Sequence, residues 1–173
     1  MNERMNPRPY LDWGASLSDC GRFRYLLWRK WDSTGDTLAV VMLNPSTADA
    51  CDDDPTIRKV VGFAKRAKFG RVEVLNLFAL RATDPKVLIR EAGDRFGPNN
   101  FKYLERHAQG RDVLVGWGAN VEHRSLFASH HSARAWLKKA SPRSVSCLGT
   151  TSGGFPRHPL MVAYETKWEA FAL

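Results

Sequence analysis

A group of polar residues follows an apolar run in the first third of the chain. The apolar run, residues 38–43, leads into Asn-Pro-Ser at 44–46 and then into four aspartates between positions 49 and 54. Carboxylates suit Mg²⁺. However, Asp54 is predicted to be the N-cap of a helix that has Pro55 in its first turn. Neighbouring aspartates in a loop are usually solvated. We therefore expect no metal, and we expect this loop to form one wall of a site.

Asn76 interrupts a second apolar run, residues 74–78. A buried carboxamide costs a few kcal/mol unless its donors and its acceptor are satisfied. Two interpretations stay open at this point. Asn76 either bonds the neighbouring backbone or presents a donor beside an acceptor to a ligand, and that pair matches the edge of a nucleobase.

A third polar segment lies near the end of the chain, in the loop "SGGFPRHPL" at 152–160. Its two glycines allow the backbone to approach a ligand closely, and its prolines fix the shape of the loop. One interpretation of His158 is a group that stabilises a developing anion or contacts a phosphate. The other is an ordinary surface histidine.

Predicted strands and helices alternate along the chain, and they must position the residues described above. The helix after Asp54 is indicated by apolar residues at i, i+3, i+4 and i+7. This alternation indicates right-handed βαβ crossovers, so we predict an α/β fold of three layers, α/β/α, with a mainly parallel four-stranded central sheet. The predicted strands are 38–43, 71–80, 112–118 and 144–149, with an edge strand within 21–32; further helices are predicted at 84–92, 98–108 and 132–140.

The loops that follow the four predicted parallel strands should meet at one edge of the sheet. In open α/β sheets this carboxyl edge is where ligands bind. The converging segments are 44–54, 76–84, 116–120 and 150–159. The three polar groups described above are therefore predicted to share one site.

Composition indicates one domain with an unusual charge. We expect residues 21–173 to form the core and residues 1–20 to form an N-terminal extension. Apolar runs are too short for a membrane span and no signal-peptide core is present, so we expect a cytoplasmic monomer.

The chain has 26 Lys and Arg against 18 Asp and Glu, which gives a net charge of +8. That excess is typical of polyanion binders, although many small soluble proteins are basic without touching nucleic acid.

The motifs together resemble a bacterial and phage family catalogued only as a domain of unknown function. The resemblance covers roughly residues 20 to 165 and rests on "MLNPSTAD", "VLNLFALRATDP", "DVLVGWG" and "LGTTSGGFPRHPL". The order of these motifs is similar to that of the uracil-DNA glycosylase superfamily. In that superfamily the first strand ends in Gly-x-Asp/Asn-Pro, a later strand ends in an Asn that reads the base, and a His-Pro loop follows near the end. The resemblance implies a uracil-DNA-glycosylase-like fold.

The resemblance also implies roles for individual residues. Asn44 matches the residue that positions or activates water, and His158 matches the catalytic histidine of the last loop. Asn76 matches the base-reading amide. We add Asp49 and Asp53 as acceptors for a hydroxylated or sugar-bearing base, and Phe155 or Leu160 as a wedge. The full prediction is Asn44 and His158 for catalysis; Pro45, Ser46, Asp49, Asp53, Asn76 and Phe78 for the substrate; and Arg81, Lys86, Phe155, Arg157 and Leu160 for DNA.

The function expected from these roles is that of a monofunctional DNA glycosylase without a cofactor. Such an enzyme would remove a modified base, including a hydroxymethylated or glucosylated pyrimidine of phage DNA, in repair or antiviral defence. One alternative is a non-catalytic reader of modified bases or nucleic acid. Two departures from the superfamily pattern favour it: Leu43 stands where a glycine is usual, and Leu160 replaces the serine after His-Pro. Another is an enzyme acting on nucleosides or nucleotides, which would not require the basic charge.

Overall fold

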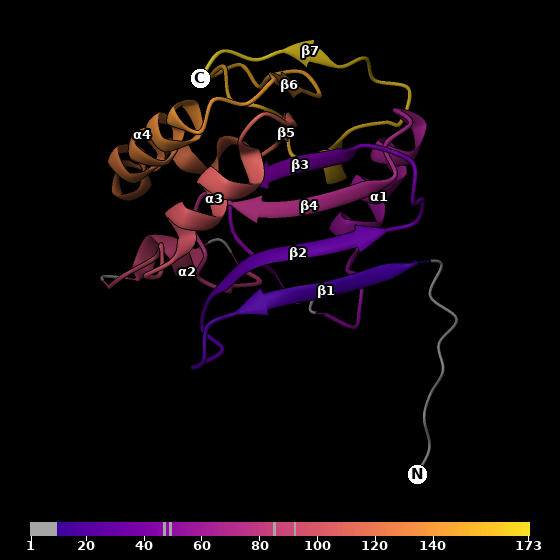
Figure 1. Cartoon of the computed structure of the whole chain (residues 1–173). Helices are drawn as coiled ribbons and strands as arrows, with labels where there is room; N and C mark the ends of the chain where they lie inside the picture. Colours follow the sequence, from indigo (N-terminus) through magenta and orange to yellow (C-terminus); the bar gives the residue numbers. More distant parts are fainter. Residues whose placement is uncertain (1–9, 47, 49, 85, 92) are drawn as a thin grey trace.

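A single sheet organises the protein, whose computed structural model describes residues 10–46, 48, 50–84, 86–91 and 93–173. The sheet has seven strands in the order β1-β2-β4-β3-β5-β6-β7 (Figure 1). The strands are β1 (Asp12–Leu17), β2 (Arg24–Lys30), β3 (Thr37–Met42), β4 (Arg71–Asn76), β5 (Asp112–Val115), β6 (Ser144–Cys147) and β7 (Glu169–Ala170).

The sheet is mixed. Parallel pairs join β4 to β3, β3 to β5 and β5 to β6. Antiparallel pairs join β1 to β2, β2 to β4 and β6 to β7. The class α/β is confirmed, but the prediction of a four-stranded sheet was wrong, because three antiparallel strands extend it at its two edges.

Two of the sequence-based assignments fail at β1. Residues 12–17 belong to the sheet rather than to an N-terminal extension, and β2 is not an edge strand because β1 covers it. The strand β1 escapes detection because Gly14 breaks its pattern and because Trp13 and Leu17 stay exposed. The glycine has a packing reason: a Cβ at position 14 would lie 2.3 Å from the Trp28 ring.

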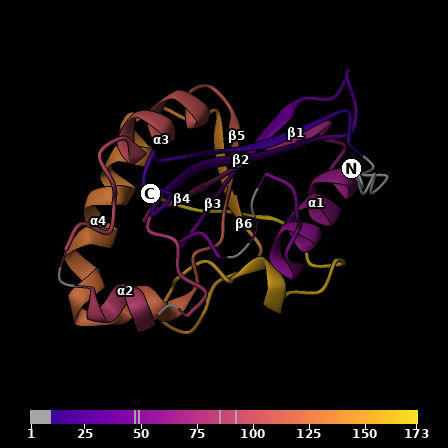
Figure 2. The same ribbon diagram turned by 90° about the horizontal axis from the view of Figure 1, so that it is seen from below.

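Helices cover both faces of the sheet. The helix α1 (Pro55–Arg66) packs on one face, and α2 (Lys86–Arg90), α3 (Asn100–Ala108) and α4 (Arg124–Lys139) pack on the other (Figure 2). Short 3₁₀ helices, η1 (Ala119–Glu122) and η2 (Pro159–Met161), follow β5 and β6. No helix in the described part of the chain has the length and apolar character needed to cross a membrane.

The start of α1 follows the sequence prediction. The Asp54 side chain caps the helix, with 2.8 Å between its Oδ1 and the backbone nitrogen of Ile57, and Pro55 occupies the first turn. In contrast, α4 begins at Arg124, eight residues before the predicted start at 132. The polar and histidine-rich segment 128–132 does not show the apolar periodicity that would have extended the prediction.

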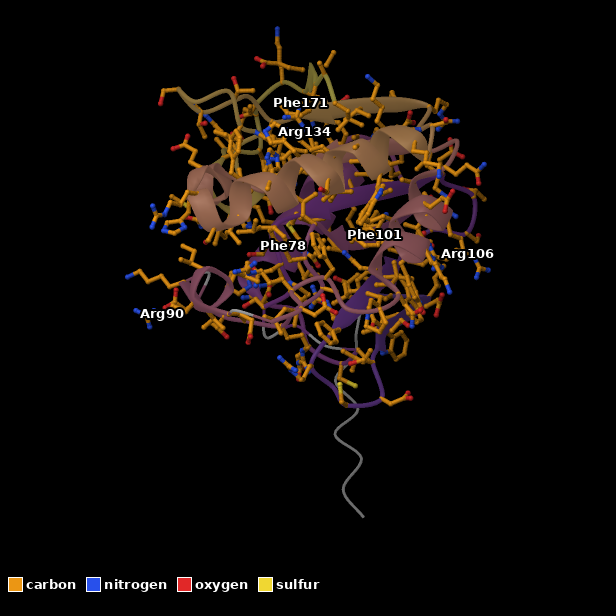
Figure 3. All side chains as sticks on the ribbon, turned by 90° about the vertical axis from the view of Figure 1, so that its left-hand side faces the viewer. Phe78, Arg90, Phe101, Arg106, Arg134 and Phe171 are labelled. Atoms are coloured by element: carbon orange, nitrogen blue, oxygen red, sulfur yellow. The ribbon has the colours of Figure 1, made fainter. Side chains whose placement is uncertain are left out.

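Aromatic side chains fill the layer between the sheet and the α2–α4 face. Figure 3 shows Phe78 and Phe101 lying inward and Arg90 and Arg106 at the periphery. The Phe78 ring is fully buried, with its centroid 5.3 Å from that of Phe96. Phe78 therefore belongs to the core, so its predicted contact with substrate has no support in the geometry.

A cluster of charged side chains lies at the amino end of the parallel strands, away from the carboxyl edge where the site is predicted. Glu73 of β4 accepts hydrogen bonds from Arg71, His107 and Arg111, and its side chain is only 5% exposed. Burial raises the pKa of Glu73, but the hydrogen bond from His107 and the charges of Arg111 and Arg71 outweigh burial and lower it to about 2. Glu73 is therefore held as a buried, fully paired carboxylate.

Chain order reverses direction within the parallel part of the sheet. From β3 the chain passes to β4 on one side, and it then returns to β5 on the other side of β3. The loops after β3 and β5 consequently diverge. A crevice outside the carboxyl ends of two such strands is the usual ligand site of an open α/β sheet.

Candidate functional site

A cavity with two lobes opens at this carboxyl edge. Both lobes are lined by Asn44, Asn120, His158 and Met161. The larger lobe, of about 540 Å³, extends toward Arg24, Met42 and the first turn of α1. The smaller lobe, of about 280 Å³, extends toward Trp117, Thr151 and Arg157. Each of the four loops predicted to converge therefore contributes lining residues.

The orientation of the Asn44 amide is fixed by its partners. Its Nδ2 donates to the carbonyl oxygen of Ala82 at 2.8 Å and to that of Pro45 at 3.1 Å. Carbonyl oxygens only accept, so the atom facing them must be the amide nitrogen. The Oδ1 of Asn44 has no hydrogen bond within the described residues. Asn44 therefore offers the cavity a hydrogen-bond acceptor that can hold a water molecule.

His158 is oriented by the backbone of its own loop. It is half-buried at the start of η2, and its Nδ1 accepts a hydrogen bond from the backbone nitrogen of Leu160 at 3.3 Å. An accepting Nδ1 carries no proton, so the proton of the neutral ring lies on Nε2. Burial lowers the pKa of His158, and the nearby Asp54 carboxylate opposes that shift only in part. At neutral pH the ring is therefore uncharged, with Nε2–H as its donor.

This arrangement predicts how activity depends on pH. The lowered pKa keeps the His158 ring neutral down to pH values below its ordinary 6.5. We expect the rate of any reaction that uses Nε2–H to stay constant between pH 8 and about 6.5 and to fall only below that range. There, protonation of Nδ1 breaks its bond to Leu160. Single-turnover rates across this range are the measurement, and a rate that rises from pH 8 to 6.5 would show that the imidazolium is the active form.

Two buried arginines hold the loop that follows β3, and the sequence analysis missed both. Arg24 lines the larger lobe and donates to the carbonyl oxygen of Ala48. Arg29, fully buried, pairs with Asp53 at 2.7 Å. The hydroxyl of Tyr10 also donates to Asp53, at 2.6 Å. The only sequence signal was the basic residues between apolar ones in 21–32, a pattern that also fits a half-exposed strand.

The predicted role of the aspartates in substrate binding is not matched by the geometry. Asp53 lines neither lobe, because its carboxylate is taken up by Arg29 and Tyr10 beneath the loop. Asp49 lies outside the described residues. Asp54, the helix cap, does line the larger lobe, together with Ser46. Pro45 is buried beside Asn44 and does not line the cavity.

The residues predicted to contact DNA divide into two groups. Arg157 and Leu160 lie at the cavity, with Arg157 exposed and Leu160 45% exposed. Phe155 is half-buried and packs against His130, their ring centroids 5.7 Å apart, so it does not form an exposed wedge. Arg81 and Lys86 line neither lobe.

Met161, Asn120 and Trp117 are among the lining residues to which the sequence analysis assigned no role. Met161 is 81% exposed beside Leu160, so the rim of the cavity carries two adjacent apolar side chains. Asn120 of η1 lines both lobes. Trp117 lines the smaller lobe, and its buried Nε1 has no partner within the described residues. Segment 116–120 was predicted to converge at this edge, but no role was predicted for Trp117 or Asn120 within it.

Asn76 lies close to the cavity without lining it. It is the last residue of β4, it is 1% exposed, and its Nδ2 finds no hydrogen-bond partner in the described part of the chain. The strand end around it is clamped by Asn100, whose Nδ2 donates to the backbone oxygens of Asn76 and Leu77. The amide nitrogen of Asn76 therefore does not bond the neighbouring backbone, and presentation of the amide to a ligand stays a prediction.

The described residues contain no group of three or more His, Cys, Asp or Glu side chains arranged to hold a metal ion. The polar groups of the residues that line the cavity are amides, hydroxyls, one imidazole, one indole and two guanidinium groups, together with the capping carboxylate of Asp54. The site is therefore built for hydrogen bonding.

Comparison with known proteins identifies the family. A family model described as "Protein of unknown function (DUF1643)" matches residues 24–160, which include β2 to β6 and all the lining residues of the cavity apart from Met161. Neither the curated proteins nor the solved structures gave a match. These comparisons supply no link to the uracil-DNA glycosylase superfamily. The chain belongs to the DUF1643 family, as its motifs predicted.

Proposed function

We propose that this protein is a monofunctional DNA glycosylase that hydrolyses the N-glycosidic bond of a modified base and leaves an abasic site. The observation that carries the proposal is the pairing of two oriented groups at one cavity. These are the Nε2–H of a neutral His158 and the Oδ1 of Asn44, which has no hydrogen-bond partner among the residues that the structure describes. One is a donor for a departing base, and the other is an acceptor for a water molecule.

The proposed reaction uses these two groups in complementary ways. The C1′–N bond breaks, and its electron pair leaves with the base, whose oxygen receives a hydrogen bond from His158 Nε2–H. Water held on Asn44 Oδ1 forms the new bond to C1′, and its proton passes to solvent or to the base. An amide is not a strong base, so Asn44 positions the water while the positive charge on the sugar activates it. No lysine lines either lobe within the described residues, which supports hydrolysis over Schiff-base chemistry.

The arrangement of the strands supports a uracil-DNA-glycosylase-like fold. In the order that the resemblance implies, Asn-Pro-Ser follows β3, Asn76 ends β4, "GWG" follows β5 and His-Pro follows β6. DNA as partner is supported by the net charge of +8, by exposed Arg157 at the cavity and by the apolar rim of Leu160 and Met161. Monomeric state and cytoplasmic location stay predictions.

Substitution of Asn44 separates catalysis from reading. We expect Asn44→Leu to slow base release about 10-fold to 100-fold, because the water loses its acceptor. DNA affinity should change less than twofold. Asn99→Leu, at an exposed position without a side-chain cap bond on α3, is the control. Gel-shift binding and single-turnover release are measured on the same DNA. Unchanged release would remove Asn44 from the mechanism.

The proposed function is tested by incubating the protein with plain DNA, uracil-containing DNA and phage DNA bearing hydroxymethylated or glucosylated cytosine. Free nucleosides form a further arm. Alkali treatment reveals abasic sites, and mass spectrometry identifies the released base. Release from one DNA supports the glycosylase and names its substrate. Binding without release from any DNA would favour the reader, and release from nucleosides alone would favour a nucleoside hydrolase.

A further inference from the structure

The charged residues of α1 are all basic. Between Pro55, where the helix begins, and Val72 in β4, the sequence contains no aspartate or glutamate. The basic residues of α1 and of the turn that follows it are Arg58, Lys59, Lys65, Arg66 and Lys68, and all are exposed except the half-buried Lys59. None of the five forms an ion pair with another described residue. The outer side of α1 is therefore a positive surface without acidic neighbours on its own element.

The position of Lys68 is not explained by helix stability. Cations in the last turn of a helix interact favourably with its dipole, which accounts for Lys65 and Arg66. The chain then leaves α1 through a Schellman motif. The backbone nitrogen of Phe69 donates to the carbonyl oxygen of Ala64 at 3.0 Å, and that of Lys68 donates to Lys65 at 3.1 Å. Lys68 has a φ of 67°, in the left-handed region where this motif usually has glycine. The chain thus accepts backbone strain and keeps a cation at this surface.

Two of the cations are held in place by an aromatic ring. Tyr164, which follows η2, lies over Gly62, where a Cβ would come within 2.4 Å of the tyrosine oxygen. Lys59 Nζ lies 3.9 Å from the centroid of the Tyr164 ring, and Arg66 Cζ lies 3.8 Å from it. Cations positioned in this way lose little freedom when they bind an anion. The glycine at position 62 is what allows the ring to lie there.

This positive surface begins next to the cavity. Pro55, Thr56 and Ile57 in the first turn of α1 line the larger lobe, and the first basic residue follows at Arg58. From Arg58 to Arg66 the helix rises about 12 Å, which is the axial rise of roughly three to four phosphates along one DNA strand. The surface lies on the opposite face of the sheet from α4 (Figure 2).

We propose that Arg58, Lys59, Lys65, Arg66 and Lys68, the α1 basic surface, bind the phosphate backbone of a nucleic acid strand beside the cavity. Charge complementarity identifies the partner as a polyanion. A lipid surface is disfavoured, because the apolar side of α1 is buried against the sheet and cannot insert into a bilayer. That the polyanion is DNA rests on the proposed function, whereas the binding of phosphates by this surface does not.

The salt dependence of binding to an unmodified duplex tests this surface without any base release. Fluorescence anisotropy measures the affinity of the whole protein for a short labelled duplex at a series of KCl concentrations. Each phosphate contact that is lost should reduce the slope of log affinity against log salt by about 0.9, which is about eightfold in affinity at about 0.1 M salt. Lys65→Gln/Lys68→Gln should therefore reduce the slope by about 1.8 and the affinity by about 60-fold at that salt concentration.

The last turn of α4 provides a matched control. Lys138 and Lys139 are exposed there, also near a helix C-terminus, and Lys138→Gln/Lys139→Gln removes the same charge from the protein. This variant should keep the slope and the affinity of the wild type. Equal losses in the two double variants would show that only the net charge matters, and they would overturn the proposal.

Lys68→Gly separates binding from structure. Glycine relieves the left-handed backbone, so this variant should melt at the temperature of the wild type or above it while its slope falls by about 0.9. A purely structural role for Lys68 would not combine these two effects. Unchanged slopes in Lys68→Gly and in Lys65→Gln/Lys68→Gln would overturn the proposal, as would a wild type that binds phosphatidylserine vesicles but not the duplex. Absence of base release from any DNA, with the slopes reduced as expected, would refute only the glycosylase.

Discussion

His158→Ala is expected to lower the rate constant of base release by about 10² to 10³, which is the usual cost of removing one donor from a developing anion. The physical reason is the loss of the Nε2–H donor, whose orientation is fixed by the hydrogen bond from the backbone nitrogen of Leu160 to Nδ1 of His158. Alanine leaves the departing base without this donor but keeps the loop. Single-turnover release on a DNA identified as substrate measures the effect, and DNA affinity should stay within about threefold of the wild type, because few phosphate contacts are lost.

The chain offers a matched control for this variant in His123. Its Nδ1 also accepts from the backbone nitrogen two residues later, Ser125, at 3.3 Å, but it caps α4 and lines neither lobe. His123→Ala should lower the free energy of unfolding only by the amount typical of a lost helix cap, and it should leave the rate constant of base release unchanged. Equal rate losses in both variants would show that the effect of His158 is structural.

Glu73→Gln is expected to lower the free energy of unfolding by about 3 kcal/mol at pH 7. The carboxylate is 5% exposed and meets Arg71, His107 and Arg111. Its pKa in the folded protein is about 2, below its ordinary value of 4.5. The depressed pKa means that the stabilisation is complete above about pH 4.5 and is lost as the pH falls through about 2.

Urea unfolding of the wild type and of Glu73→Gln at a series of pH values measures this contribution. The two curves should be separated at pH 7 and approach one another in acid, because the wild type then carries a protonated Glu73. Glu105→Gln, at an exposed carboxylate of α3, is the control and should stay within about 0.5 kcal/mol of the wild type. A constant separation at all pH values would mean that the carboxylate charge is not what stabilises this end of the sheet.

The parts of the fold that the sequence predicted are those with strong local signals. The runs at 38–43 and 112–118 are apolar enough to be buried on both faces. The strand β5 lies inside the second run, and β3 overlaps the first but begins one residue earlier, at Thr37. Asp54 and Pro55 mark the start of α1 through cap chemistry that acts within one turn. Once these elements alternate, the convergence of their loops at one edge follows from topology alone.

The failures concern features decided by tertiary contacts. The strand β1 lacks an alternating pattern, since Gly14 is dictated by the Trp28 ring across the sheet. Asp53 looked available for a ligand because its partner Arg29 lies 24 residues away and shows no sign of burial in the sequence. Phe155 looked like a wedge because its contact with His130 depends on how α4 packs. Distant partners of this kind leave no local trace.

The site itself was predicted in part. Asn44 and His158 were placed together because the loops after the parallel strands converge, and both line the same cavity. Their protonation and orientation could not be anticipated, because they depend on the backbone oxygen of Ala82 and the backbone nitrogen of Leu160. The separation of Asn76 from the cavity was equally hidden, since it depends on strand register.

The backbone and the side chain of Leu160 have separate roles. The backbone nitrogen of Leu160 donates to His158 Nδ1 and so keeps the imidazole proton on Nε2, whereas the Leu160 side chain, 45% exposed, faces outward at the rim. Every amino acid except proline supplies that nitrogen with its hydrogen. A library randomised at codon 160 should therefore vary the surface that the rim presents while the tautomer of His158 is inherited unchanged, and proline clones alone should behave as if His158 itself had been altered.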